Sequence, residues 1–191
     1  MLETVLKAGV LLLLVTGPPL FDYALATRVK GFGVRSDDPE LRRMFFLKVM
    51  ADVLAILAAL LITSLGWPGT QWKWLIIGVA VTYAGVGLRY WAIRTLGRFF
   101  QFVIAIQDGH RVVTSGPYRF VRHPSYTGLI MVQLGIGIAL ANSLSLVLCL
   151  TVPMLALVPR IRREESALLG ELGTEYTAYA AKTKRLIPKV W

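Results

Sequence analysis

The stretch TGLIMVQLGIGIALANSLSLVLCLTVPMLALVP, residues 127–159, contains no charged residue and decides the fold. A membrane-spanning helix needs about 20 apolar residues, so this run is too long for one crossing. The polar triplet ANS at 141–143 interrupts the run near its middle. The sequence therefore predicts a tight helical hairpin made of two short membrane crossings.

Three further apolar segments precede this hairpin. They run from about Val5 to Leu25, from about Phe45 to Leu65 and from about Trp72 to Ile93. The prolines of GPP at 17–19 are expected to kink or interrupt the first segment, and GWPG at 66–69 marks a turn after the second. Together with the hairpin, these segments predict an all-α, polytopic membrane helical bundle with about five transmembrane helices.

The composition agrees with a membrane protein. Hydrophobic residues make up 55% of the 191-residue chain and charged residues 17%, whereas an average soluble domain is about 25% charged. The mean hydropathy is +0.61. The single cysteine, Cys149, lies in an apolar run and is expected to be a small core residue rather than a nucleophile. We expect one membrane domain over residues 1–191.

The basic residues predict the topology. Of the 21 Lys and Arg residues, only Lys7 and Lys73 fall on the side opposite the others in a five-span arrangement. Basic loops face the cytoplasm, so the N-terminus is expected outside and the C-terminus inside. The net charge of +10 is explained in this way, and no nucleic-acid partner is expected. Asp22 and Asp52 are expected to pair with nearby arginines at the membrane interface.

A rigid polar segment, GPYRFVRHPSYTG at 116–128, directly precedes the hairpin. Because proline disfavours helix at the residue before it, Gly116 and His123 should be extended or turning. Pro124 suits the first position of the next helix, whose free N–H groups could receive an anion or a carboxylate. Arg122 and His123 add donors beside this helix start.

A second polar segment, RIRREESALLGELGTEYTAYAAKTKRLIP at 160–188, follows the hairpin. It predicts cytoplasmic amphipathic helices, with Gly173 as a C-cap. Glu164 follows Arg160 by one helical turn, so the two share a face. Spacing alone leaves open a surface salt bridge or a functional pair. Two histidines and one cysteine, far apart in the chain, make a poor metal site, so no metal is expected.

The combination of GHRVVTSGPYRFVRHPSYTG with EESALLGELGTEYTAYAAKTKRLIP resembles the isoprenylcysteine carboxyl methyltransferase family. The resemblance covers about Leu96 to Trp191, and the N-terminal spans carry no matching motif. It implies a membrane enzyme that uses S-adenosyl-L-methionine. It also implies that residues 96–191 form the cofactor-binding catalytic half, while residues 1–95 supply three N-terminal spans.

The resemblance assigns roles to individual residues. Arg160 matches an arginine that faces the methyl acceptor. The positions that match cofactor-binding residues of the family are His110, Arg111, Val112, Val113, Tyr118, His123, Pro124, Ser125, Tyr126 and Glu164. Valine at 112 replaces a common leucine of the family.

The expected reaction is methyl transfer to a carboxylate of a lipophilic, isoprenylcysteine-like acceptor that arrives from the bilayer, at an active site on the cytoplasmic side. A carboxylate with a pKa of about 4 is already ionised at pH 7 and needs no general base. Three alternatives remain open from the sequence. They are an NADPH-dependent membrane reductase of an isoprenoid or sterol-like lipid, a phospholipid N-methyltransferase, and a basic scaffold that binds anionic membrane lipids.

Overall fold

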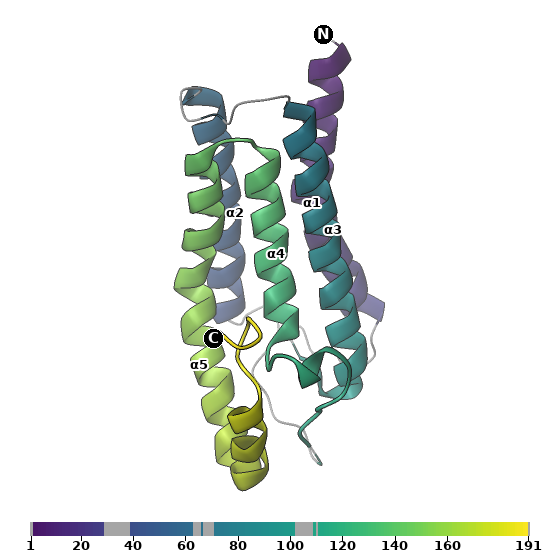
Figure 1. The fold of residues 1–191 in the computed structure, drawn as a ribbon, viewed down its shortest axis with the longest axis vertical. Helices are drawn as coiled ribbons and strands as arrows, with labels where there is room; N and C mark the ends of the chain where they lie inside the picture. The colour runs from purple at the N-terminus through teal and green to yellow at the C-terminus, as the bar shows by residue number, and fades with distance from the viewer. Residues whose placement is uncertain are drawn as a thin grey trace.

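The computed structural model describes residues 2–28, 39–62, 66, 71–101, 109 and 111–190. Its five long helices are α1 (Leu2–Arg28), α2 (Pro39–Leu61), α3 (Gln71–Leu96), α4 (Pro124–Ala139) and α5 (Ser143–Lys182), with short 3-10 helices η2 (Gly97–Phe99) and η3 (Gly116–Arg119) after α3 and before α4. The long helices run side by side along the molecule (Figure 1). The predicted all-α helical bundle is confirmed.

The helical hairpin predicted within residues 127–159 is present as α4 and α5. Ala141 adopts a left-handed conformation with φ of 50° at the turn. The side chain of Asn142 caps α5 by accepting a hydrogen bond from the backbone N–H of Ser145 at 3.1 Å. The same side chain donates to the carbonyl of Ile62 at 2.9 Å, which ties the turn to the end of α2.

Three helices are long and apolar enough to cross a membrane by length and composition, within the part of the chain that the structure describes: Arg42–Leu61, Trp72–Phe99 and Ser143–Lys182. The other two predicted crossings correspond to shorter apolar segments, Gly9–Phe21 and Pro124–Ala139. Helix α1 continues through Pro18 and Pro19, so the first segment is not interrupted. Prolines are tolerated in membrane helices because neighbouring groups satisfy the freed carbonyls.

Helix α5 is much longer than one crossing. A straight helix of its 40 residues would measure about 60 Å, twice the roughly 30 Å hydrocarbon core. Its apolar part, residues 143–159, suits the hydrocarbon core in composition, whereas its polar part, residues 160–182, is expected to extend beyond it. The helix is broken at Gly173, which has φ of 50° and ψ of −119°, and the chain then folds back toward the start of α4 (Figure 1). The expected end of a helix at Gly173 is confirmed.

Helices α3 and α4 approach each other through glycines spaced seven residues apart on each helix. A Cβ atom on Gly85 would lie 2.7 Å from the carbonyl oxygen of Gly128, and one on Gly78 would lie 2.5 Å from that of Gly135. The reverse contacts are equally short, because a Cβ on Gly128 or Gly135 would lie 2.6 Å or 2.5 Å from the facing carbonyl. Small residues allow such close helix packing in membranes, where apolar burial alone gives little driving force.

Gly85→Ala is therefore expected to destabilise the protein, because its Cβ would collide with backbone atoms that cannot move independently of α4. Overpacking of this kind costs about 1–3 kcal/mol, which corresponds to a fall of roughly 2–12 °C in melting temperature. The matched control is Gly87→Ala on the same helix, where nothing lies within 4 Å of the new Cβ. Thermal melting in detergent checks the difference, and equal melting temperatures for the two variants would contradict the assignment.

The bundle core receives side chains from every long helix. Leu14 of α1, Ala55 of α2, Leu75 of α3, Ile136 of α4 and Cys149 of α5 belong to one buried cluster. Cys149 is fully buried, which confirms its expected role as a core residue. Large exposed apolar side chains on the bundle, which reach 78% exposure at the end of α2, suit a lipid-facing surface.

The expectation that Asp52 pairs with an arginine is wrong. Asp52 is buried in α2, where its carboxylate accepts from Lys48 Nζ at 2.6 Å and from Gln133 Nε2 of α4 at 3.0 Å. A lysine four residues earlier on the same helix reaches the carboxylate more directly than the arginines nearer the helix start. The side chain of Asp22 lies outside the described part of the structure, so its pairing with an arginine stays a prediction.

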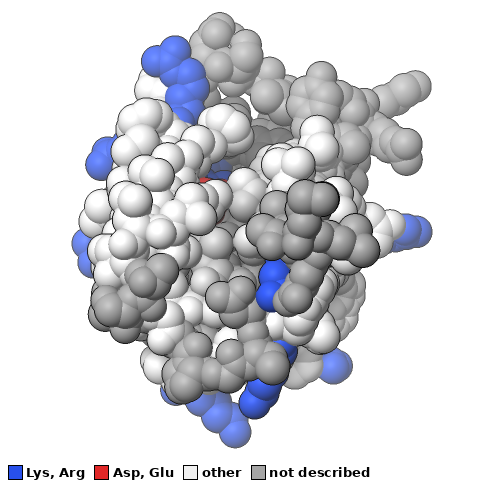
Figure 2. Space-filling model, turned by 90° about the horizontal axis from the view of Figure 1, so that it is seen from above, with Lys and Arg blue, Asp and Glu red and all other residues white. Residues whose placement is uncertain are grey.

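The alternating helix directions bring the polar segments to one end of the bundle. The C-terminal end of α3, the N-terminal end of α4 and the polar part of α5 lie together at the lower end of Figure 1. The opposite end carries the α4–α5 turn, and most of the described atoms seen from that end are uncharged, with Lys and Arg atoms mainly toward the edge (Figure 2). At that end, Lys7 lies 5.3 Å from the centre of the Trp72 ring, and Lys73 lies 5.4 Å from that of Trp74.

Candidate active site

The segment before α4 has the rigid form that its prolines predict. His123 is the N-cap residue of α4 with a non-helical φ of −123°, and Pro124 occupies the start of the helix. Gly116 begins η3 with φ of 57°, and a Cβ there would lie 2.8 Å from Thr95 Oγ1 of α3. Only glycine combines this conformation with such close packing.

The chain after α5 pairs with this segment through its backbone. The N–H groups of Arg122 and His123 donate to the carbonyls of Lys184 and Arg185 at 2.7 Å and 3.0 Å. Thr127 Oγ1 donates to the carbonyl of Leu186 at 2.8 Å. The two polar segments that the sequence singled out therefore lie against each other at one end of the bundle.

Tyr126 connects the two polar segments at the level of their side chains. Arg160 Nε donates to the Tyr126 hydroxyl at 2.8 Å, and this hydroxyl donates to Glu164 Oε2 at 2.7 Å. The Tyr126 ring stacks on the His123 ring, with centroids 5.6 Å apart. The expected shared face of Arg160 and Glu164 is confirmed, and a tyrosine hydroxyl from α4 bridges them. Arg160 itself is only 5% exposed.

Glu165, next to Glu164, joins three basic residues of the two segments. Its Oε1 accepts from Arg122 Nε at 2.8 Å and lies 3.2 Å from His123 Nε2, while its Oε2 accepts from Arg185 Nε at 2.8 Å. Burial alone would raise the pKa of Glu165, but the hydrogen bonds from His123, Arg185 and Arg122 outweigh it and lower the pKa to about 2. Arg122 also donates to the carbonyls of Ala180 and Thr183.

Tyr118 is buried beside the same cluster. Its carbonyl accepts a hydrogen bond from the Tyr179 hydroxyl at 2.7 Å, which fixes η3 against the chain that follows Gly173. Burial raises the pKa of the Tyr118 hydroxyl, and the nearby negative charge of Glu164 raises it further. The hydroxyl therefore keeps its proton at neutral pH.

Two other predicted residues, Pro124 and Ser125, lie at the start of α4. Pro124 is fully buried at the start of α4. The Ser125 hydroxyl accepts a hydrogen bond from Arg89 Nη1 of α3 at 2.7 Å, so it faces α3 rather than Glu164. This bond holds the start of α4 against the end of α3.

The HRVV stretch is only partly described, because His110 lies outside the described residues. Arg111 is exposed, and Val112 and Val113 are half-buried. The backbone N–H of Val112 donates to Glu175 Oε1 at 3.3 Å. This stretch therefore lies against the chain that follows Gly173. It is at the same end of the molecule as Tyr126 and its partners Arg160, Glu164 and His123, which we call the Tyr126 cluster.

Three residues of this region were not assigned from the sequence. Arg89 reads as a basic residue at the end of a span, and Arg185 as one of several in a basic tail. Glu165 stands beside Glu164 in the pair EE, but spacing along one helix does not reveal which partners a turn of chain beyond Gly173 brings to it.

Comparisons with known proteins identify the family of this chain. The model of the isoprenylcysteine carboxyl methyltransferase (ICMT) family matches residues 76–170. The chain is 30% identical over 174 residues to protein-S-isoprenylcysteine O-methyltransferase B of Arabidopsis thaliana, covering 88% of this chain and 86% of that protein. It is 34% identical over 129 residues to a probable protein-S-isoprenylcysteine O-methyltransferase of Oryza sativa subsp. japonica, covering 65% and 68% of the two chains.

A solved structure gives the same result. The eukaryotic intramembrane Ras methyltransferase ICMT aligns with a TM-score of 0.65 at 28% identity and covers 76% of this chain. The match covers 52% of that protein, so the chain spans about half the length of this solved relative. The resemblance stated from the motifs is confirmed: the chain belongs to the isoprenylcysteine carboxyl methyltransferase family of membrane methyltransferases.

Proposed function

We propose that this protein transfers a methyl group from S-adenosyl-L-methionine to the carboxylate of a lipophilic, isoprenylcysteine-like acceptor. The observation that carries the proposal is the Tyr126 hydroxyl, which joins Arg160 at 2.8 Å to Glu164 at 2.7 Å. The Arg160 guanidinium, which suits the carboxylate of an acceptor, thereby lies close to Glu164, whose carboxylate suits a polar cofactor. The relatives named as isoprenylcysteine O-methyltransferases support the same reaction.

The residues around Glu164 fit the cofactor. Glu164 Oε2 accepts from Tyr126, whereas Oε1 lies 3.9 Å from His123 Nδ1, which is beyond hydrogen-bond distance. The Glu164 side chain is 32% exposed, so Oε1 can accept from an amino group or a ribose hydroxyl. The stacked rings of His123 and Tyr126 lie beside this carboxylate. When bound, S-adenosyl-L-methionine would supply an electrophilic methyl group on a sulfonium centre.

The protein's own contribution is orientation and exclusion of water. An acceptor carboxylate is ionised at neutral pH, so no group of the chain has to remove a proton. Arg160 orients this carboxylate with its planar guanidinium, and correct orientation of two reactants is worth about 7–11 kcal/mol of barrier. The Tyr126 hydroxyl keeps the guanidinium in place by accepting from its Nε atom.

The proposed topology places this site on the cytoplasmic face, with the N-terminus outside and the C-terminus inside. The support is the accumulation of Lys and Arg in the sequence at the end that carries the site, which is typical of cytoplasmic loops. A water-soluble cofactor would approach from the cytoplasm, and a lipophilic acceptor would approach laterally from the bilayer.

The proposal is tested by incubating membranes that contain the protein with methyl-labelled S-adenosyl-L-methionine and an S-prenylcysteine. A carboxyl methyl ester releases its label in base, whereas a methylated amine does not. Stabilisation in detergent by S-adenosylhomocysteine would support methyl transfer, and stabilisation only by reduced nicotinamide dinucleotide would support a reductase instead. The named relatives favour carboxyl methylation over the reductase and phospholipid alternatives.

Glu164→Gln is expected to weaken the binding of S-adenosylhomocysteine by about 10-fold or more, because a hydrogen bond to a charged group contributes roughly 1.5–3 kcal/mol. Calorimetric titration of the purified variant measures this change. Glu171→Gln is the matched control, because Glu171 is exposed on the same helix outside the Tyr126 cluster. Native affinity in Glu164→Gln would remove Glu164 from the cofactor site.

A further inference from the structure

Tyr176 lies just beyond the break at Gly173, in the part of α5 that folds back toward the start of α4 (Figure 1). The residue is only 6% exposed. Within the described part of the chain, its hydroxyl is shielded from water and has no hydrogen-bond partner. An unpaired buried hydroxyl costs stability, so one that is kept is expected to find a partner outside the chain, such as a ligand.

The neighbours of Tyr176 belong to segments that carry residues assigned to the cofactor. The Tyr176 ring packs edge-on against the ring of Tyr179, with centroids 6.2 Å apart, and the Tyr179 hydroxyl donates to the carbonyl of Tyr118. Glu175, directly before Tyr176, accepts from the backbone N–H of Val112. Because Tyr118 and Val112 both match cofactor-binding positions of the family, Tyr176 adjoins two segments assigned to the cofactor.

The Tyr176 hydroxyl also lies within electrostatic reach of the Tyr126 cluster. Burial raises the pKa of this hydroxyl, and the negative charges of Glu165 and Glu164 raise it further, against the opposite effect of Arg122. The hydroxyl therefore keeps its proton at neutral pH and is an uncharged donor. Glu165 is already bonded to three basic residues, so its charge is compensated within the chain.

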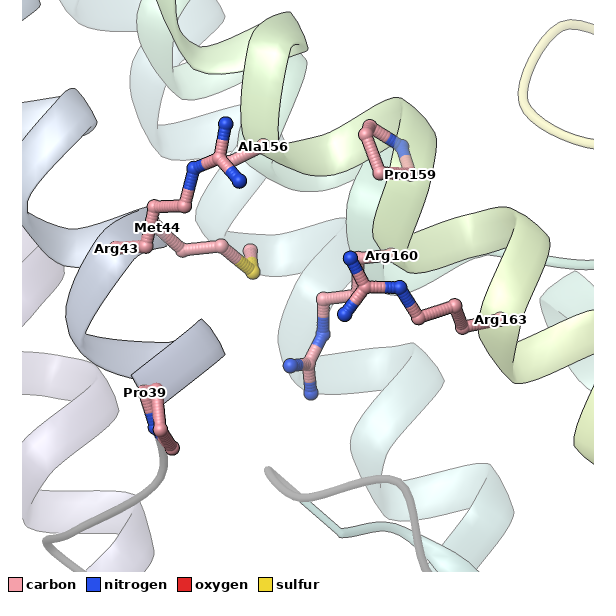
Figure 3. Close-up of a pocket in the computed structure, with 7 residues that line it drawn as sticks. All are labelled: Pro39, Arg43, Met44, Ala156, Pro159, Arg160 and Arg163. Carbon is pink, nitrogen blue, oxygen red and sulfur yellow. The ribbon is translucent and has the colours of Figure 1, made fainter.

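The pocket beside Arg160 does not explain cofactor binding. It has a volume of about 160 Å³, lies between the start of α2 and the middle of α5, and is lined by Met44, Pro159 and Arg160 among others (Figure 3). None of the described residues that match cofactor-binding positions lines it. The unpaired hydroxyl of Tyr176, which adjoins two segments that carry such residues, is the better candidate for a further contact with the cofactor.

We infer that Tyr176 is a cofactor-binding residue whose hydroxyl donates a hydrogen bond to the nucleoside part of S-adenosyl-L-methionine. This inference rests on the proposed function. An uncharged hydroxyl among aromatic rings suits the uncharged nitrogen and oxygen atoms of an adenosine. The ammonium and carboxylate groups of the amino-acid part would instead need charged partners when buried.

The test compares Tyr176→Phe with native protein and with Tyr83→Phe, which removes the same hydroxyl from an exposed tyrosine of α3. Calorimetric titration measures the affinity of each purified protein for S-adenosylhomocysteine and for methylthioadenosine, which lacks the amino-acid part. We expect Tyr176→Phe to weaken the binding of both ligands by about 3- to 10-fold, the effect of losing one hydrogen bond between uncharged groups. Tyr83→Phe should bind both ligands like native protein.

Thermal melting in detergent without ligand gives a second measurement. Because Tyr176→Phe removes an unpaired hydroxyl, its melting temperature should equal or exceed that of native protein. Tyr179→Phe is the contrast, since it removes the hydrogen bond to the Tyr118 carbonyl and should lower the melting temperature by about 2–4 °C. A comparable fall in Tyr176→Phe would show that its hydroxyl has a partner within the chain, and the inference would be overturned.

The outcomes separate this inference from the proposed function. If the native protein methylates an S-prenylcysteine but Tyr176→Phe binds S-adenosylhomocysteine as tightly as native protein does, the inference is overturned and the function stands. If Tyr176→Phe weakens the binding of both ligands but no methyl transfer occurs, the cofactor contact stands and the proposed reaction fails. A loss confined to S-adenosylhomocysteine would place the contact at the amino-acid part and overturn the assignment to the nucleoside. Native protein that binds neither ligand would overturn both proposals.

Discussion

Arg160→Gln is expected to lower kcat/KM for an S-prenylcysteine by about 100-fold or more while the affinity for S-adenosylhomocysteine stays within a few-fold of native. Loss of one preorganised donor to a reacting group typically costs 10²–10³ in rate, roughly 3–4 kcal/mol. Arg160 Nε contacts the Tyr126 hydroxyl, and this hydroxyl should keep its bond to Glu164 in the variant. Initial rates with labelled cofactor and calorimetric titration measure the two effects separately.

Arg160→Lys distinguishes charge from geometry. Lysine keeps the positive charge but lacks the planar, two-donor face and the Nε atom that reaches Tyr126. We expect Arg160→Lys to remain strongly impaired, because the acceptor carboxylate would be attracted without being oriented. Arg162→Gln, an exposed neighbour, should keep native activity. Near-native turnover in Arg160→Gln, with the protein folded and binding S-adenosylhomocysteine, would contradict the assigned role.

The sequence predicted those features of the fold that depend on local chemistry. An uncharged run with a polar interruption predicted the hairpin at Asn142, and a glycine after a polar helix predicted the break at Gly173. The prolines of GPP did not interrupt α1, because membrane helices tolerate the backbone hydrogen bonds that proline removes. Local pattern thus located the turns well, and of the two effects expected from the prolines it is the interruption of the helix that did not occur.

The site was predictable only in part, for a physical reason. Spacing on one helix placed Arg160 and Glu164 on a common face, and the motif resemblance added Tyr126. Neither could show that a single hydroxyl joins them, because this contact depends on the relative height of α4 and α5. The same holds for Ser125, whose hydroxyl bonds Arg89, and for Glu165, whose partners come from chain that folds back after Gly173.

Glu165→Gln is expected to destabilise the protein by about 3 kcal/mol, although the neighbouring Glu164→Gln should change stability little. Glu165 is the shared anion of Arg122, His123 and Arg185, and its side chain is only 12% exposed. Removing one partner of a buried ion pair leaves the remaining charges without compensation, which costs about 3–5 kcal/mol. Because Arg122 and Arg185 belong to the two segments that pair through their backbones, the C-terminal tail should detach first.

The pH dependence of the stability of Glu165→Gln tests whether the charge of Glu165 is the cause of the destabilisation. The pKa of the Glu165 carboxylate is about 2 in the folded protein, compared with 4.5 for an unperturbed glutamate. The stabilisation that the ionised carboxylate gives is therefore complete above about pH 4.5 and is lost as the pH falls through 2. The difference in melting temperature between native protein and Glu165→Gln should therefore be constant from pH 7 to about pH 5 and shrink in more acidic buffer. Limited proteolysis at pH 7 should cleave the Glu165→Gln tail before the bundle, whereas Glu164→Gln should resist like native protein. A difference that persists unchanged to pH 2 would show that shape, rather than charge, makes Glu165 important, since only the ionised carboxylate can hold Arg122 and Arg185 together.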